Sequence, residues 1–456
     1  MLSRRKTAAA AIEHIAPDTA RRTLPRTLGA FTATAVLIGA IVGSGIFRVP
    51  SAVAATVGGP AGLMLVWVFG GLIALFGALS MAELAAMFPR TGGPYVYLLK
   101  AYGRPLAFLF GWMWLLTAPI SWAALSLTFA QYLATLVPLT NAAQHWIAAL
   151  AIVFFCALQY RSVHIGAFIQ NLATTTKVLA LLGLALVIFL LAPHLSSGGT
   201  AAATAQPMAW SGIGIALVAV LWAYDGWEDL TTLSGEIRNP GKNLPIALIA
   251  GTLIVVVVYL IVNAAYLHAL PYAQLAASHA VASDAMVAAM GPLGAAATAV
   301  LIIVSVLGTL NGSVLTHPRV FFAMAEDNLF FGSIGKVHPR FETPYVAIIL
   351  TATLAIIYVL LRNFIQLAEA YVLGVWPFLA LAVIGLFILR RKRPELERPY
   401  KALGYPVIPA LFILGTFFVI AYALWQQPVS TGVSIAITLV GIPLYIGWER
   451  LRRRHS

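Results

Sequence analysis

The sequence predicts an all-α polytopic membrane protein with about twelve transmembrane helices, built as a 5+5 inverted repeat in which helices 1 and 6 are broken. Of its 456 residues, 61% are hydrophobic and 9% are charged, whereas about 25% of the residues in a soluble domain are charged. Stretches of roughly 20 apolar residues, which suffice to cross a bilayer, recur along the chain. Two of these stretches contain residues that interrupt a helix, in corresponding positions of the two halves.

The apolar stretches give the expected order of the elements. The first five form one repeat, residues 28–192, and the next five form the second repeat, residues 210–391. Two further helices fall within residues 392–449, and basic cytoplasmic segments, 1–27 and 450–456, end the chain. The expected spans are 30–57, 61–88, 105–136, 145–160, 167–192, 211–236, 245–269, 292–325, 344–361, 365–390, 405–425 and 430–448.

The positive charge indicates how the chain is oriented. The net charge is +13, with 28 Lys and Arg residues against 15 Asp and Glu. All basic residues except Arg48, Lys177 and Arg362 lie in the terminal segments or on alternate loops. Because basic loops stay in the cytoplasm, we expect a multi-pass protein of the plasma membrane, in a bacterial inner membrane, with both termini cytoplasmic. The basic excess then predicts a lipid bilayer around the chain and no nucleic-acid partner.

Two interruptions stand near mid-membrane. Gly43, Ser44 and Gly45 follow one another in span 1, and three such poor helix formers predict an unwound stretch. Span 6 has a similar weak point over residues 223–227. Close helix packing is the alternative explanation for the glycines. The matched pair favours unwinding, because paired interruptions are typical of transporters with a site between two repeats.

Several motifs occur in order along nearly the whole chain from residue 28. They are Gly43-Ser44-Gly45-Ile46-Phe47, Ala82-Glu83-Leu84, Phe88-Pro89-Arg90-Thr91-Gly92-Gly93-Pro94-Tyr95, Trp222-Ala223-Tyr224-Asp225-Gly226-Trp227, Gly235-Glu236-Ile237-Arg238-Asn239-Pro240, Asn311-Gly312-Ser313 and Arg393-Pro394-Glu395-Leu396-Glu397-Arg398-Pro399-Tyr400. On these motifs the chain resembles the amino acid–polyamine–organocation superfamily, and most closely the L-type amino-acid transporters with their bacterial serine/threonine-exchanger relatives. The resemblance implies an amino-acid permease that works by alternating access to a central site.

The two breaks indicate how such a site holds a small amino-acid substrate. The amides of Ser44, Gly45 and Ile46 open the second half of helix 1, where the helix dipole favours a carboxylate. Carbonyls near Ile41 and over residues 222–225 end the first halves of the broken helices and can accept an ammonium. The expected substrate-binding residues are Ile41, Gly43, Ser44, Gly45, Ile46, Trp222, Ala223, Asp225 and Tyr259.

Lys177 stands about ten residues into span 5, roughly 15 Å from the nearer helix end. A charge at that depth costs at least about 3 kcal/mol and needs a partner or a cavity. In the family that the chain resembles, a Lys on helix 5 reaches the unwound part of helix 1 in place of a sodium ion, which implies sodium independence. Bonding to nearby carbonyls for stability alone is the alternative. A buried Lys can also carry a proton, so exchange and proton symport both stay open.

Other residues near the breaks allow two interpretations each. Asp225 and Glu228 have the spacing of a capping box, or Asp225 contacts the substrate directly. The L-type members more often have Gly at this position, and Glu228 and Asp229 depart from them in a way that would suit a cationic amine. Trp222 matches an aromatic residue that closes the outer gate in the family, and Tyr259 matches a helix-7 tyrosine near the site. Ordinary packing is the alternative for both aromatic residues.

The remaining polar residues predict little. Glu83 and Arg90 stand at the inner end of span 2. We expect them to form surface salt pairs; the alternative is an ionic latch that opens and closes with the transporter. Arg48 has no assigned role. The one cysteine, Cys156, lies inside span 4, so no disulfide-linked subunit is expected. The histidines are scattered, and we find no metal-ligand cluster, phosphate loop or nucleophile arrangement. We therefore expect no cofactor, no metal and no enzymatic activity.

The sequence thus predicts a transporter of neutral L-amino acids that works by sodium-independent exchange. The alternative is proton-coupled uptake of a cationic amino acid or polyamine, which Asp225, Glu228 and Asp229 motivate. A nutrient sensor with the same fold would bind an amino acid without counterflow.

Overall fold

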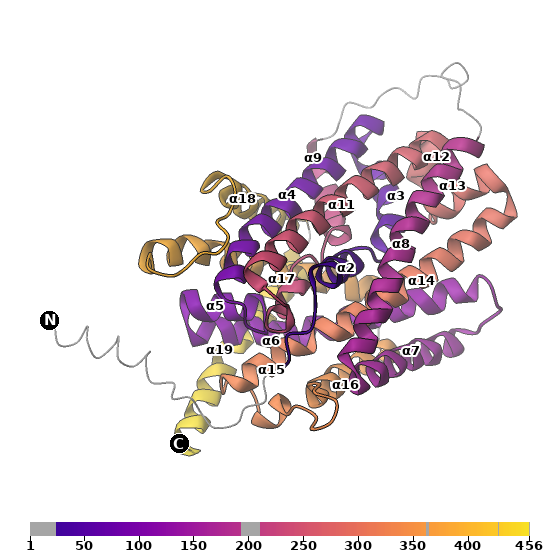
Figure 1. Ribbon diagram of the computed structural model, residues 1–456. Coiled ribbons are helices and arrows are strands. Elements are labelled where there is room, and N and C mark those ends of the chain that lie inside the picture. The colour runs from indigo at the N-terminus through magenta and orange to yellow at the C-terminus, as the bar shows by residue number, and fades with distance from the viewer. Residues whose placement is uncertain (1–23, 193–209, 362–363, 427, 456) are drawn as a thin grey trace.

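The computed structural model describes residues 24–192, 210–361, 364–426 and 428–455. Most of the predicted N-terminal basic segment, Arg362 and the last residue of the predicted tail lie outside these ranges. Within them the chain forms helices and turns, and its one extended pairing is an isolated bridge between Leu28 and Ile237. The helices gather into one bundle (Figure 1), so the all-α prediction is confirmed.

The predicted spans correspond in order to helices or pairs of helices. The first five are α2 (Ala30–Ile41) with α3 (Gly45–Val57), α4 (Pro60–Met87), α6 (Arg104–Ala134), α7 (Asn141–Arg161) and α8 (Val163–Leu191). The next five are α9 (Trp210–Ala223) with α10 (Asp229–Thr232), α11 (Pro240–Ala269), α14 (Pro292–Thr316) with α15 (Pro318–Glu326), α16 (Tyr345–Leu361) and α17 (Phe364–Lys392). The last two are α18 (Val407–Gln426) and α19 (Pro428–His455).

Nine helices within the described ranges are long and apolar enough to cross a membrane, and α2 with α3 forms a tenth span that is bent by 43°. Two further predicted spans contain shorter apolar helices, α9 and α16. The prediction of a multi-pass membrane protein is therefore confirmed. The predicted span 8 is divided after residue 316, because Pro318 has no amide hydrogen to continue the helix.

Short helices that were not predicted from the sequence connect the spans. They are α5 (Pro94–Tyr102), α12 (Tyr272–Ala277), α13 (Val281–Met290) and the 3-10 turns η1 (Ser234–Glu236) and η2 (Gly332–Gly335).

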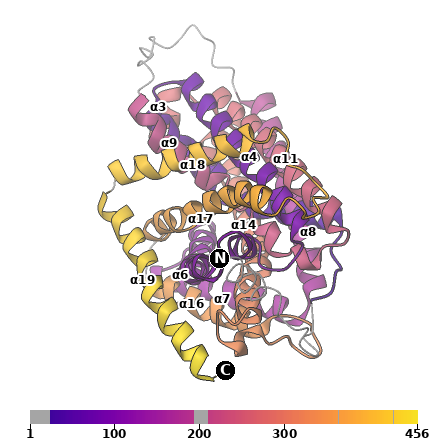
Figure 2. The ribbon, with the colours of Figure 1, turned by 90° about the vertical axis from the view of Figure 1, so that its left-hand side faces the viewer.

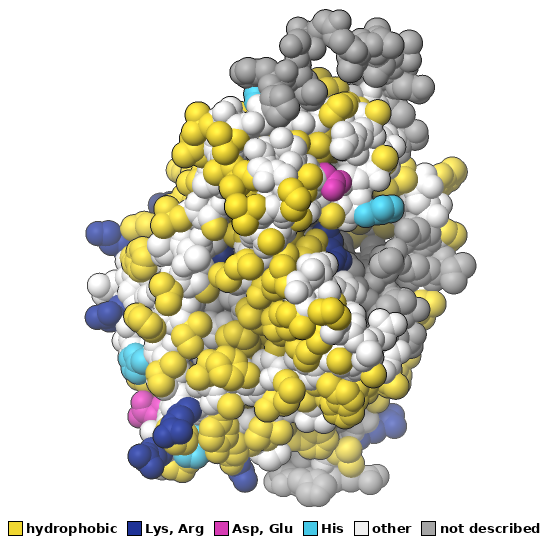
Figure 3. All heavy atoms as spheres, turned by 90° about the vertical axis from the view of Figure 1, so that its right-hand side faces the viewer, with side chains coloured by type: hydrophobic (Ala, Val, Ile, Leu, Met, Phe, Trp, Pro, Cys, Tyr) yellow, Lys and Arg dark blue, Asp and Glu magenta, His cyan; other side chains and the backbone are white. Residues whose placement is uncertain are grey.

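The outer faces of the bundle are apolar. On α8, the side chains of Phe168, Leu172, Leu179 and Leu190 are each more than half exposed. Figure 3 shows hydrophobic side chains over most of one face, with Lys and Arg toward its lower and left-hand edges. Such a surface suits contact with lipid acyl chains rather than water. Helix α19 runs along the edge of the bundle (Figure 2). Only 17% of its most apolar stretch is buried against the rest of the protein.

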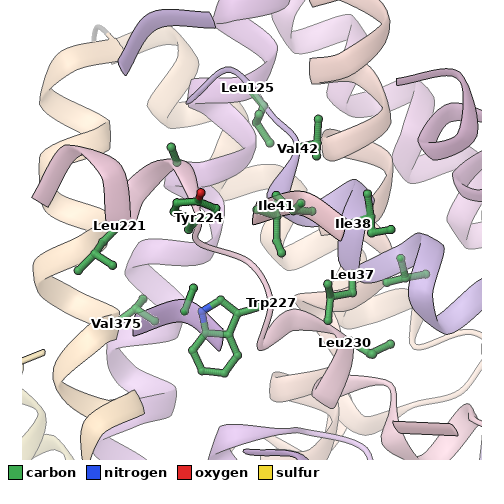
Figure 4. Packing of buried hydrophobic residues seen from close by; sticks show 14 of the residues in the cluster. Leu37, Ile38, Ile41, Val42, Leu125, Leu221, Tyr224, Trp227, Leu230 and Val375 are labelled. Atoms are coloured by element: carbon green, nitrogen blue, oxygen red, sulfur yellow. The ribbon is translucent and has the colours of Figure 1, made fainter. Parts of the chain in front are cut away.

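Aromatic side chains fill the interior near the two breaks. The ring of Trp67, on α4, meets Tyr224 and Tyr259 edge-on, with centroids 5.6 and 5.5 Å apart. All three rings are fully buried, so they fix α4 and α11 against the segment that follows α9. Figure 4 shows Tyr224 in the same buried region as Ile41 and Val42.

Ion pairs join segments that are distant in sequence. They are Glu83 with Arg390, Arg90 with Asp327, Arg104 with Glu449 and Glu236 with Arg319. The expected surface pairing is wrong for Glu83, whose side chain is fully buried. Its carboxylate accepts from Arg390 Nε at 2.9 Å and from the amide of Ala402 at 2.7 Å. These donors are needed because an unpaired charge at such a site would be strongly destabilising.

Candidate functional site

The break in span 1 separates α2 from α3. The amide of Gly43 donates to Ile41 O at 2.8 Å instead of continuing the α-helix. The amides of Ser44, Gly45 and Ile46 donate to no acceptor among the described residues. They stand at the N-terminus of α3, where orphan amide groups and the helix dipole favour a negative charge. The predicted unwound stretch is confirmed.

The break in span 6 covers residues 224–228, between α9 and α10. Gly226 has φ +100°, a conformation that favours glycine. The predicted break is confirmed, whereas the predicted capping box is wrong. Glu228 itself precedes α10 and makes no capping bond with its side chain. The carboxylate of Asp225 accepts from Trp376 Nε1 at 2.9 Å, so it is directed toward α17.

The two breaks lie against each other. A Cβ atom on Gly45 would lie 2.7 Å from Cα of Ala223, and one on Gly226 would lie 3.1 Å from the carbonyl carbon of Ala40. Both distances are shorter than ordinary carbon contacts. Glycine therefore permits the backbones of helices 1 and 6 to approach this closely.

Lys177, at the centre of α8, reaches the break in span 1 and is fully buried. Its ammonium donates to Gly39 O at 3.0 Å, Val42 O at 2.9 Å and Thr309 Oγ1 at 2.8 Å. All three of its hydrogens are thus used. Unwinding removes the i+4 amide partners of Gly39 and Val42, so the ammonium takes the place of the missing helix donors.

Two more side chains satisfy carbonyls at this break. Tyr259, on α11, donates to Ile41 O at 3.1 Å, and Ser305, on α14, donates to Val42 O at 3.1 Å. Each carbonyl oxygen has two lone pairs. The carbonyl of Ile41 accepts from both Tyr259 and the amide of Gly43, so its two lone pairs are used within the chain.

A pocket of about 50 Å³ lies between the breaks. Of the predicted site residues, those that line it are Ile41, Gly43, Ser44, Gly45, Trp222 and Asp225. The other predicted site residues do not line the pocket; they are Ile46, Ala223, Tyr259 and Lys177. Lys177 donates a hydrogen bond to Thr309, which does line it. The structure thus brings the two predicted halves of the site together around one cavity.

His317, which no sequence motif singled out, lines the same pocket. Its Nδ1 atom accepts from Trp122 Nε1 at 3.1 Å, and its Nε2 atom lies 3.1 Å from Asp229 Oδ2. Because an indole nitrogen only donates, Nδ1 is unprotonated and Nε2 carries the hydrogen that is donated to Asp229. A polar residue inside a spanning segment is itself a signal for function, and that signal applies to His317.

Glu228 lies between two other acids, Asp225 and Asp229, and is fully buried. Neither of its carboxylate oxygens has a hydrogen-bond partner among the described residues. A charged carboxylate in such a place is strongly disfavoured, so the neutral acid suits this conformation. Glu228 does not line the pocket.

Other polar residues lie away from the pocket. Arg48 donates to Gln131 Oε1 at 3.2 Å, and its guanidinium lies 5.4 Å from the ring centroid of Tyr132. Cys156 lies on α7. No group of three or more His, Cys, Asp or Glu side chains is placed to hold a metal ion in the part of the chain that the structure describes.

Comparison with known proteins gives consistent results. A family model described as "Amino acid permease" matches residues 28–447. The serine/threonine exchanger SteT of Bacillus subtilis is 36% identical over 94% of this chain and 98% of its own length. The human b(0,+)-type amino acid transporter 1 is 30% identical over 89% of this chain and 84% of its own. The large neutral amino acids transporter small subunit 2 of Oryctolagus cuniculus is 30% identical, over 92% and 80%.

Proposed function

The chain belongs to the amino acid permease family, and from this premise we propose that it exchanges neutral L-amino acids across a membrane by alternating access, without sodium. The predicted resemblance to the amino acid–polyamine–organocation superfamily is confirmed by the family match. The names of the relatives, an exchanger of serine and threonine and a transporter of large neutral amino acids, support exchange of neutral substrates.

The observation that best supports this proposal is that the unwound segments of spans 1 and 6 line one pocket. In the proposed complex, the substrate carboxylate binds the amides of Ser44, Gly45 and Ile46, which are unused by the described residues. The α-ammonium binds backbone carbonyls that end the first halves of helices 1 and 6, near Ile41 and Ala223, where unwinding removes the helical partners. These contacts bind the α-carboxylate and the α-ammonium, which all amino acids share.

Lys177 is proposed to act in place of a coupling cation. Its ammonium sits on the carbonyls of Gly39 and Val42, where a sodium ion would need oxygen ligands of the same kind. A fixed positive charge at that position disfavours binding of a second cation. Transport would then be independent of sodium.

Trp222 is proposed as the gate of the pocket. Its side chain lines the pocket next to the break in span 6, and it is only partly buried. A large aromatic ring at that place closes access when it turns over the substrate. Tyr259 stabilises the facing break, in span 1, through its bond to Ile41 O.

We also propose the arrangement of the chain in the membrane. Residues 28–192 and 210–391 form the two inverted repeats, and residues 392–449 add two peripheral helices. Basic residues on alternate loops support cytoplasmic termini, 1–27 and 450–456, in a bacterial inner membrane. The position of Cys156, within a membrane helix, supports a chain without a disulfide-linked subunit.

The proposal is tested with purified protein in proteoliposomes. Labelled neutral amino acid is added outside, with and without unlabelled amino acid inside, in sodium or choline buffer and at several pH values. Uptake that requires internal amino acid and is the same in both buffers is expected. Uptake driven by a pH gradient into empty vesicles, strongest for lysine or a polyamine, would instead support the proton-coupled alternative.

A further inference from the structure

Helix α14 presents a row of polar side chains along the pocket. Thr309, Ser313 and His317 are four residues apart and all line it, so each lies roughly 6 Å from the next along the helix. Thr309 is bonded to the carbonyls of the span-1 break. The row therefore runs from the proposed backbone-binding end of the pocket toward His317.

The far end of this row has unused hydrogen-bonding capacity. The Oδ1 atom of Asp229 is buried and has no partner among the described residues. Its other oxygen accepts from His317. The hydroxyl groups of Ser121 and Ser313, which line the same pocket, make no hydrogen bond to any other described residue. Buried polar groups normally have partners, so a ligand group is expected to meet them.

We propose that Ser121, Ser313 and Asp229 form a subsite that binds the side-chain hydroxyl of a small amino acid, such as serine or threonine. The inference rests on the proposed function: if the breaks bind the carboxylate and ammonium of the substrate, its side chain extends toward the end of the pocket near His317. His317 is a positioning residue: it donates to Asp229 Oδ2 and leaves Oδ1 directed at the ligand. Trp122 fixes the imidazole by donating to Nδ1.

The size of the pocket selects a short side chain. A cavity needs about 10 to 15 Å³ for each water-sized group, so 50 Å³ holds only a few such groups. Lysine and ornithine extend three or four methylene groups and an ammonium beyond Cα, and phenylalanine adds a ring. Serine and threonine place a donor and acceptor one bond beyond Cβ, close to Ser313.

The chemistry of the subsite disfavours apolar analogues of the same size. Alanine or 2-aminobutyrate would bury Asp229 Oδ1 and the two serine hydroxyls without a partner. Sites built to bind a substrate hydroxyl reject the analogue that lacks it more strongly than apolar pockets reject an extra group. We expect at least about a tenfold preference for serine over alanine, and for threonine over 2-aminobutyrate, in the ratio of exchange rate to KM.

The test measures this ratio for serine, alanine, threonine, 2-aminobutyrate and lysine in proteoliposomes. Ser121→Ala, Ser313→Ala and Asp229→Asn should bring the serine-to-alanine ratio close to one while alanine exchange continues. Ser126→Ala is the matched control, since its hydroxyl is on the same helix as Ser121 but bonds to Ala123 O at 3.0 Å and does not line the pocket. This control should keep the wild-type ratio.

The role of His317 has a separate readout. His317→Phe should lower the serine-to-alanine ratio, and His317→Gln should restore part of it, because the amide can again donate to Asp229. A purely structural role would lower the rates for both substrates equally in both variants.

The possible failures are distinguishable. Absence of counterflow with every amino acid would reject the proposed function itself. Counterflow with equal ratios for serine and alanine in the wild type would reject the subsite and leave exchange intact. A preference for lysine, lost in Asp229→Asn, would overturn the hydroxyl assignment in favour of a cationic side chain.

Discussion

The indole nitrogen of Trp376 donates a 2.9 Å hydrogen bond to Asp225 Oδ1, and so ties α17 to the break of span 6. Trp376 is almost fully buried, and a hydrogen bond to a carboxylate contributes about 1.5 to 3 kcal/mol. Trp376→Phe keeps most of the ring packing but removes the donor. We expect exchange to fall by about tenfold.

The same substitution at an exposed tryptophan is the control. Trp146 is 62% exposed on α7, so Trp146→Phe should exchange amino acid at the wild-type rate. Equal rates for the two variants would show that the bond to Asp225 does not position the break.

Lys177→Ala is expected to abolish or severely reduce exchange. The variant leaves the carbonyls of Gly39 and Val42 without their ammonium donor, and unsatisfied groups in a membrane interior are costly. Counterflow in proteoliposomes measures the effect, and Lys336→Ala, at an exposed loop position, is the control. Wild-type rates in Lys177→Ala would reject the role assigned to this side chain.

Two glycines of the same break should respond differently to alanine. At Gly45 the new methyl group would lie 2.7 Å from the backbone of Ala223, whereas at Gly43 its nearest neighbour is 3.6 Å away. Gly45→Ala should therefore separate the breaks, lower the thermal midpoint in detergent and stop exchange. Gly43→Ala should remain folded with a midpoint close to wild type. A Gly45→Ala protein as stable and active as wild type would contradict the observed close approach.

Arg319 and Glu236 form a bidentate ion pair, with bonds of 3.0 and 3.2 Å, and each side chain is only 1% exposed. Removing one partner of such a pair typically costs about 3 to 5 kcal/mol. Arg319→Gln should therefore be expressed poorly or melt well below the wild type. Arg393→Gln, at the exposed pair with Glu395, should change stability by about 0 to 1 kcal/mol. Similar melting curves for both variants would show that the buried pair is not a major stabilising contact.

Glu228→Gln should leave neutral exchange within about twofold of wild type. The buried carboxyl has no partner among the described residues, and glutamine is a neutral side chain of nearly the same shape. Exchange is measured between pH 5.5 and 8, with the variant expected to follow the wild-type profile. Loss of a pH-driven uptake in this variant would identify Glu228 as a proton carrier and favour the proton-coupled alternative.

The sequence was sufficient to predict the spans and the two breaks because these features are local. Apolar composition is read over roughly 20 residues, and the weak helix propensity of Gly43, Ser44 and Gly45 lies in the motif itself. Lys177 also stood out, since a charge at that depth requires a partner. The partners at Gly39, Val42 and Thr309 come from helix packing and are visible only in the structure.

The side-chain end of the pocket was not predictable in the same way. His317, Asp229 and Trp122 come from three separate helices or breaks, and no spacing in the sequence relates them. The capping-box prediction failed for a related reason. It considered Asp225 only against its own helix, whereas Trp376, far along the chain, binds the carboxylate.

The bend of 43° between α2 and α3 has a mechanical consequence. A straight span must break several internal hydrogen bonds before one half can swing relative to the other, whereas here those bonds are already absent and side chains of α8, α11 and α14 hold the exposed carbonyls. The joint can therefore turn as a hinge at little energetic cost. In the proposed alternating access, each half of span 1 would move as one helix about this joint.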